Sequence, residues 1–319
     1  MKEVREENGS LSNKLDRTTW RILFTEEEHP PLWRRSEISQ LVETKSILDL
    51  EVFDPDLLQE GRASELRSLK DLGVYREVDL PAGAKALSTR WVDKYKEVLE
   101  RLTVKSRLVA RGFEVGPKDS SGSDTFAPTV STEAVRALLA LEQVQRDEGS
   151  VDRVTAVADV STAFLYAPME CDRAHSGETV YVRPPREAGV QKGKVWALNR
   201  ALYGLREAPR KWYETIRKLL ETLGLRPLAR EPSVFVRTGS EDSAGRFEVA
   251  VGVHVDDLIL LGERSAVTRV LDGLSRELRL KYELAGAHED RDWAYLGRRV
   301  SQRDGVLSIR MRRVYADRL

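Results

Sequence analysis

The spacing of hydrophobic residues predicts four helices separated by short strands. Leucines at near-helical intervals predict an amphipathic helix over Asp56–Leu72. A second helix is predicted over Thr132–Glu148, with an apolar face of Val135, Leu138, Leu139, Leu141 and Val144. A third helix is predicted to start near Pro209 and to end at Gly224, since proline suits a helix start and glycine a helix end. Ser265 is expected to cap the fourth, which turns Val267, Val270, Leu271, Leu274 and Leu278 inward.

Shorter apolar runs between turn residues predict strands. They cover Gly73–Leu80, Thr89–Tyr95, Val104–Ala110, Val154–Val160, Thr179–Val182, Val195–Leu198, Val234–Val236 and Phe247–Val255. Trp293–Val300 and Val306–Ile309 are expected to form a closing hairpin. The strand–helix–strand–strand–helix order predicts an α+β fold with helices on one face of an antiparallel, ferredoxin-like sheet.

Candidate chemistry is concentrated in Val249–Gly262, where two apolar runs flank the acids Asp256 and Asp257. This pattern predicts a hairpin with both carboxylates at its tip, close enough to share a divalent cation. An ordinary turn is the alternative, because Asp is common in turns. Asp159, near the end of another predicted strand, is either a third acid or a cap on the next turn.

Composition changes this picture little. The chain has 319 residues, 41% of them hydrophobic and 33% charged, which suits one large or two ordinary globular domains. A single cysteine excludes an internal disulfide, and the four histidines have no metal-ligand spacing. There is no apolar run of the roughly 18 residues that a membrane span needs, and no signal peptide. We expect a soluble, intracellular and cytoplasmic protein without membrane contact.

The net charge is zero, but the charges are unevenly distributed. Residues 1–60 contain 8 basic and 14 acidic side chains, residues 90–111 contain 7 and 3, and residues 291–319 contain 8 and 3. The predicted hairpin over 89–110 carries Lys94, Lys96, Lys105 and Arg107. Such cations suit a triphosphate or a nucleic-acid backbone, and they equally suit a solvated surface.

The order of short motifs resembles the reverse transcriptase of copia-type LTR retrotransposons. The blocks are Trp91-Val92 with Lys94 and Lys96, KSRLVARGF (Lys105–Phe113), DTFAP (Asp124–Pro128), ADVSTAFLYAPM (Ala158–Met169), VYVRPP (Val180–Pro185), LYGLREAPRKWY (Leu202–Tyr213), HVDDLILLG (His254–Gly262) and YLGRRVS (Tyr295–Ser301). The resemblance covers the chain from about Leu57 onward. It implies a polymerase palm with fingers over residues 57–319, truncated so that the thumb is largely absent, after a charged extension or linker over residues 1–56.

The resemblance also implies roles for individual residues. Asp159, Asp256 and Asp257 would be catalytic acids that bind Mg²⁺ or Mn²⁺ for two-metal nucleotidyl transfer. Leu296 and Gly297 would contact the primer. The nucleotide would be bound by Phe164, Tyr203, Gly204, Lys94, Lys96, Lys105 and Arg107. The implied partners are dNTPs, an RNA or DNA template with primer, and other parts of the retrotransposon polyprotein.

Two positions depart from the family pattern: His254 replaces the usual tyrosine before V-D-D, and Glu207 replaces a glutamine. The three acids are all present in the order of the family, beside the basic hairpin, and the leading hypothesis is an RNA-directed DNA polymerase. Two alternatives stay open: an inactive, truncated relic that retains the palm fold and weak nucleic-acid binding, and another palm enzyme such as a nucleotidyl cyclase.

Overall fold

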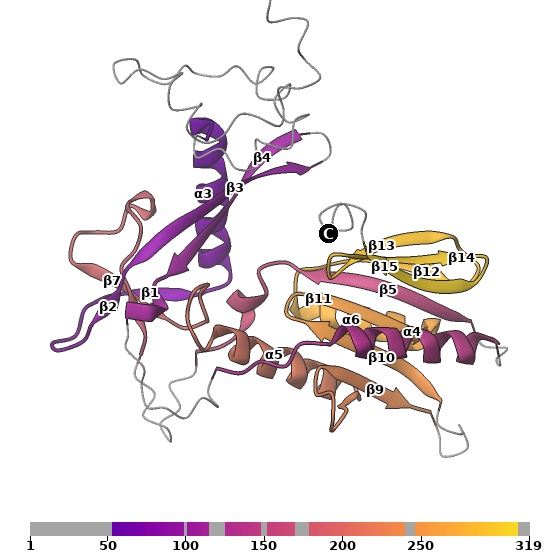
Figure 1. The fold of residues 1–319 in the computed structure, drawn as a ribbon. Coiled ribbons are helices and arrows are strands. Elements are labelled where there is room, and N and C mark those ends of the chain that lie inside the picture. Colours follow the sequence, from indigo (N-terminus) through magenta and orange to yellow (C-terminus); the bar gives the residue numbers. More distant parts are fainter. Residues whose placement is uncertain are drawn as a thin grey trace, which may run out of the picture. The chain divides into compact units, whose positions relative to one another are not determined.

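The computed structural model describes residues 53–98, 101–114, 125–147, 152–169, 179–239 and 246–311 (Figure 1). Residues 1–52 of the predicted extension, Asp124 of the DTFAP block and the C-terminal residues 312–319 lie outside these ranges. The chain divides into two compact units, one formed by Met1–Ser68 and Trp91–Leu108, the other by Leu69–Arg90 and Val109–Leu319. Among the described helices, none has the length and apolar character to cross a membrane.

The first unit contains most of helix α3 (Pro55–Asp71) and of the two-stranded sheet β3 (Thr89–Val98) and β4 (Arg101–Ala110). Leu57, Tyr95 and Val104 form its small core. The helix approaches β4 closely at Gly61, where a Cβ atom would lie 2.3 Å from the Val104 carbonyl oxygen. The predicted helix and both predicted strands are confirmed.

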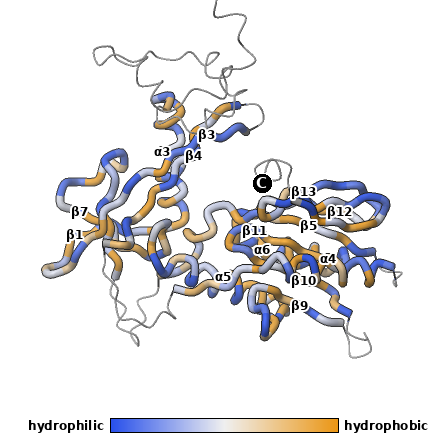
Figure 2. Tube along the Cα trace, viewed as in Figure 1, coloured by the Kyte–Doolittle hydropathy of each residue, from blue (hydrophilic) through white to orange (hydrophobic). Residues whose placement is uncertain are grey.

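The second unit is built around an antiparallel sheet of six strands in the order β12-β5-β11-β10-β9-β8. Its central strands are rich in hydrophobic residues because both of their faces are buried (Figure 2). The strands are β5 (Arg153–Val160), β8 (Arg226–Pro227), β9 (Val234–Thr238), β10 (Phe247–His254), β11 (Asp257–Glu263) and β12 (Leu280–Gly286). The predicted mixture of helices with an antiparallel sheet is confirmed.

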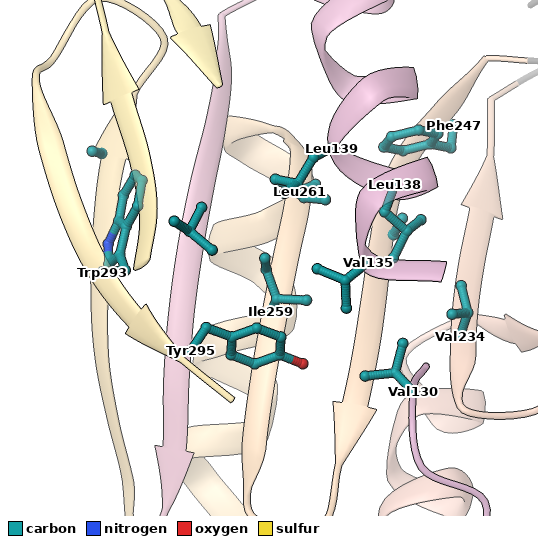
Figure 3. Close-up of a cluster of buried hydrophobic side chains, with 13 residues drawn as sticks. Val130, Val135, Leu138, Leu139, Val234, Phe247, Ile259, Leu261, Trp293 and Tyr295 are labelled. Atoms are coloured by element: carbon teal, nitrogen blue, oxygen red, sulfur yellow. The ribbon is translucent and has the colours of Figure 1, made fainter. Parts of the chain in front are cut away.

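Helices cover both faces of this sheet, so the expectation of a single covered face was wrong. Helix α4 (Thr132–Asp147) packs on the face that carries Ile259 and Leu261, where Tyr295 also lies (Figure 3). Helices α5 (Ala208–Thr222) and α6 (Arg264–Glu277) pack on the opposite face, where the Tyr213 ring of α5 contacts Phe235. The physical reason is that successive side chains of a strand point to opposite faces of the sheet, and the central strands are apolar on both faces. Each apolar face must be covered by helices to be removed from water.

Two smaller sheets complete the second unit. One has the order β1-β7-β6-β2 and the other β13-β14-β15. Their strands are β1 (Tyr75–Asp79), β2 (Ala86–Leu87), β6 (Tyr181–Val182), β7 (Lys194–Leu198), β13 (Arg291–Tyr295), β14 (Arg298–Arg303) and β15 (Val306–Met311). Short 3₁₀ helices are η3 (Gly112–Glu114), η4 (Ala163–Tyr166) and η5 (Arg186–Ala188). The predicted closing hairpin is thus a three-stranded sheet, because Leu296 and Gly297 form an additional turn with positive φ.

Two helix details also differ from prediction. On α4, Leu141 and Val144 are 52% and 50% exposed, whereas Glu142 is fully buried because it pairs with the Arg146 and Arg153 guanidinium groups. Ser265 does not cap α6, which begins one residue earlier at Arg264 after an extended Glu263 without a side-chain cap. The predicted bounds of α4 and α6 are otherwise close to those observed.

Candidate active site

Two of the predicted acids are direct neighbours across two strands. Asp159 is near the end of β5 and Asp257 is the first residue of β11, and these two residues are paired in the antiparallel register. Paired residues in such a ladder have Cβ atoms about 4.5–5.5 Å apart and side chains on one face. Both carboxylates therefore leave the same face at the same end of the sheet.

The third acid, Asp256, lies in the turn between β10 and β11. The pair His254 and Asp257 closes the hairpin, so the turn residues are Val255 and Asp256. The Val160 N–H of β5 donates to the Asp256 carbonyl oxygen at 2.9 Å. The prediction of two acids at the hairpin tip is corrected to one, because Asp257 already belongs to the strand.

The acids repel one another. The pKa of Asp257 is raised from its ordinary value, first by burial and then by the negative charges of Asp256 and Asp159, while His254 opposes the shift. Among the described residues, no three acids, histidines or cysteines are grouped so as to hold a metal ion. The described residues thus place the acids at one end of the sheet, and they do not form a closed set of metal ligands.

Predicted nucleotide-pocket residues from two distant motifs are in contact. Phe164 of η4 and Tyr203, in the loop before α5, have ring centroids 5.7 Å apart in an edge-to-face arrangement. Gly204 has φ +84°, and a Cβ atom there would lie 2.1 Å from the Ala110 carbonyl oxygen. Only glycine fits this position, because the Ala110 backbone lies directly against it.

The four predicted phosphate-binding cations share one face of the β3–β4 hairpin. Burial alternates along β4: Val104, Ser106 and Leu108 are buried, whereas Lys105 and Arg107 between them are exposed. Lys94 and Lys96 are likewise exposed on either side of the buried Tyr95. Since strand side chains alternate between faces, helix α3 covers one face and the cations occupy the other.

The predicted primer-contacting residues Leu296 and Gly297 form the turn between β13 and β14. Leu296 packs on the core under α4, and Gly297 is exposed. The preceding Tyr295 is 1% exposed, and its hydroxyl group lies 3.5 Å from the Gly252 carbonyl oxygen of β10. Burial first, and then the charge of Asp257, raises the pKa of Tyr295.

One residue at the site was predicted only as part of a buried helix face. The Trp212 indole N–H of α5 donates to the Val255 carbonyl oxygen at 2.6 Å, beside Asp256. Periodicity predicts that Trp212 is buried, but it contains no information on a partner 43 residues away. Of the two departures, His254 has a buried Nδ1 atom without a hydrogen-bond partner among the described residues, and Glu207 is the residue at the N-cap of α5.

Comparison with known proteins places these features in a family. The family model "Reverse transcriptase (RNA-dependent DNA polymerase)" matches residues 72–319. The Pol polyprotein of transposon TNT 1-94 from Nicotiana tabacum is 29% identical over 275 residues, which is 80% of this chain and 19% of the relative. The transposon RE1 polyprotein from Arabidopsis thaliana is 29% identical over 63% of this chain and 13% of its own length.

Two further similarities are more distant. The Ty1-BL Gag-Pol polyprotein of Saccharomyces cerevisiae is 23% identical over 94% of this chain and 17% of the relative. A foamy viral protease–reverse transcriptase bound to double-stranded DNA aligns with 81% of this chain and 36% of its own, at 12% identity and a TM-score of 0.40. A TM-score this low does not establish a common fold.

The chain spans about a fifth or less of the length of these polyproteins. The family match itself covers most of this chain, including the acids, the basic hairpin and the aromatic pair. The predicted resemblance is therefore confirmed, and the chain belongs to the reverse transcriptase family, in the branch found in copia-type retrotransposons.

Proposed function

We propose that this chain is the RNA-directed DNA polymerase domain of a copia-type retrotransposon polyprotein. It adds deoxynucleotides to a primer paired with an RNA or DNA template. The observation that carries the proposal is the cross-strand pairing of Asp159 with Asp257, beside Asp256, in a chain of this family. In this assignment the six-stranded sheet is the palm, and α3 with the β3–β4 hairpin forms the fingers.

The acids suit divalent cations. Asp159, Asp256 and Asp257 would hold Mg²⁺ or Mn²⁺, because carboxylate oxygens are the hard ligands that these ions prefer. A cation would also relieve the repulsion that raises the pKa of Asp257. Mg²⁺ usually binds one or two protein carboxylates and completes its shell with water and substrate phosphates, so a closed protein cage is not required. When bound, such ions activate the primer 3′-hydroxyl and stabilise the charge on the leaving pyrophosphate.

The remaining predicted residues would bind substrates. Phe164 would pack under the sugar of the incoming nucleotide and exclude a 2′-hydroxyl group, and its contact with Tyr203 supports this assignment. The cationic face of the β3–β4 hairpin would donate hydrogen bonds to triphosphate oxygens. Leu296 and Gly297 would contact the primer from the turn between β13 and β14, where Gly297 is exposed.

Primer extension tests the proposal. The chain, an RNA template with annealed DNA primer, dNTPs and Mg²⁺ should give extended primer, and Asp257→Asn and Asp159→Asn should each reduce kcat by about 100-fold or more. Asp272→Asn is the matched control, because this carboxylate is exposed on α6 away from the site.

Each alternative predicts a different result. Template–primer binding without extension by the unmodified chain would support the relic and contradict the proposal. Cyclic nucleotide formed from NTP alone would indicate a cyclase, which the retrotransposon relatives do not support. Extension that is unchanged by Asp257→Asn would remove this acid from the mechanism.

A further inference from the structure

The turn that carries the acids has an unfavourable backbone conformation. Val255 has φ +56°, in the left-handed region that favours glycine. A β-branched residue is rare there, because such a conformation is strained and persists only where its surroundings hold it. The structure must therefore contain contacts that fix this turn.

Two hydrogen bonds fix it from opposite sides. The Trp212 indole N–H donates to the Val255 carbonyl oxygen, and the Val160 N–H donates to the Asp256 carbonyl oxygen. Trp212 is 1% exposed, and its hydrogen bond to the partly buried turn is short, 2.6 Å. Because the indole is buried, its N–H needs a partner inside the protein, and an unpaired N–H there would be costly. Both turn carbonyls are thus attached, one to α5 and the other to β5.

The Trp212 bond is not a general consequence of burying tryptophan. Trp196 and Trp293 are also almost completely buried, and within the described part of the chain their indole nitrogens have no hydrogen-bond partner. All three contribute a large apolar surface to the core. What distinguishes Trp212 is the position of its N–H beside the acidic turn.

Helix α5 also begins directly after the loop that holds Tyr203 and Gly204. The N-terminal side of this helix therefore leads into the aromatic pair with Phe164, while its second turn holds the acidic turn. A single helix connects the proposed nucleotide pocket with the proposed metal-binding turn.

We propose that Trp212 is a positioning residue, whose indole N–H holds the Val255 carbonyl and so keeps Asp256 and Asp257 in place beside Asp159. The proposal rests on the proposed function only in assigning the three acids to metal binding. Trp212 itself touches no substrate or metal ion, and acts through the backbone of the turn.

The experiment compares two variants that each lose one buried indole N–H. Trp212→Phe removes the N–H that donates to Val255, and the matched control Trp293→Phe removes one without a partner. Amide hydrogen exchange at Val160 reports the turn without metal or catalysis, because this N–H donates to Asp256. We expect exchange at Val160 to accelerate about tenfold or more in Trp212→Phe relative to amides at the centre of β5, and to stay unchanged in the control.

Metal binding provides a second measurement. Mn²⁺ titration followed by electron paramagnetic resonance should give an affinity about tenfold weaker in Trp212→Phe than in Trp293→Phe, as for other groups that orient metal ligands. In primer extension, kcat should fall by a similar factor while KM for dNTP changes little. If Trp212→Phe does not fold, replacement of Trp212 by benzothienylalanine keeps the ring shape and removes only the N–H.

The outcomes separate the two proposals. Unchanged Val160 exchange and unchanged Mn²⁺ affinity in the folded Trp212 variant would overturn the positioning role, whatever the polymerase activity. Faster Val160 exchange in a chain that extends no primer would support the positioning role and contradict the proposed function.

Discussion

At the scale of single residues, the negative charge of Asp257 lowers the stability of the folded chain. Asp257 stands half-buried between two other carboxylates, and its raised pKa shows that the folded chain holds its proton more tightly than the unfolded chain does. The free energy of unfolding therefore decreases as the pH rises from the ordinary aspartate pKa of 3.8 through the raised value. This contribution is unfavourable at neutral pH without cations.

Replacing Asp257 should consequently stabilise the fold while removing activity. Asp257→Asn is expected to raise the free energy of unfolding at neutral pH by less than about 1 kcal/mol, since solvent screens part of the repulsion. The gain should disappear at a pH well below 3.8, where the carboxyl group is neutral in both the folded and the unfolded state. Urea denaturation at both pH values, without divalent ions, measures it.

The control for this prediction is Asp272→Asn, which changes an exposed acid of α6. It should give no comparable gain at neutral pH. A lower stability of Asp257→Asn than of the unmodified chain at neutral pH would contradict the argument from repulsion.

At the scale of elements, helix α3 supports the basic hairpin from outside the matched family region. The helix ends at Asp71, one residue before the match begins at residue 72. Arg62 pairs with Asp93 of β3, and Glu65 accepts a hydrogen bond from the Leu108 N–H of β4 at 3.4 Å. The helix is thus fixed to both strands of the hairpin.

Glu65 makes this attachment sensitive to pH. Burial raises its pKa from 4.5 to about 7, although the Leu108 N–H, Arg107 and Lys105 partly oppose the shift. Since the folded state retains the proton, stability falls as the pH rises from 4.5 to about 7. At about 1.4 kcal/mol per unit, the loss is on the order of 3 kcal/mol.

Glu65→Gln should remove this pH dependence while keeping an acceptor for Leu108. We expect slower amide exchange along β4 in the variant than in the unmodified chain above about pH 7, and convergence of the two below the ordinary glutamate pKa. Glu60→Gln, on an exposed position of the same helix, is the control. Equal exchange rates in Glu65→Gln and the unmodified chain at all pH values would show that burial of the Glu65 carboxylate does not lower stability.

At the scale of the whole second unit, a buried ionic network joins three elements. Glu142 of α4 pairs with Arg146 of the same helix and with Arg153 of β5. Arg146 also donates to the Gln302 side-chain oxygen of β14. The network therefore ties the six-stranded sheet, its covering helix and the C-terminal sheet together.

Removing the carboxylate should be costly because it leaves two guanidinium groups without their buried partner. Glu142→Gln is expected to lower the free energy of unfolding by about 3–5 kcal/mol. Glu221→Gln, which breaks the solvent-accessible pair with Arg217, should cost less than about 0.5 kcal/mol. Urea denaturation of the two variants measures the contrast, and similar losses would contradict the role of burial.

The sequence by itself determined the features that depend on neighbouring residues. Spacing of apolar positions predicted the helices at Pro55–Asp71, Thr132–Asp147 and Ala208–Thr222 to within two residues at their termini. Glycine at position 224 marked a helix end because it adopts φ +85° there. Short motifs in a fixed order also identified the family. These signals are local, so they are readable without the fold.

The tertiary structure decided which distant residues meet. It placed Asp159 opposite Asp257 and brought the Phe164 and Tyr203 rings into contact. It also positioned the Trp212 indole N–H to donate to the Val255 carbonyl oxygen. It also buried Glu142 on α4, where the carboxylate pairs with Arg146 of the same helix and with Arg153 of β5. Strand register and long-range hydrogen bonds depend on packing of the whole sheet, and the residues that make them lie too far apart in the chain for local patterns to record.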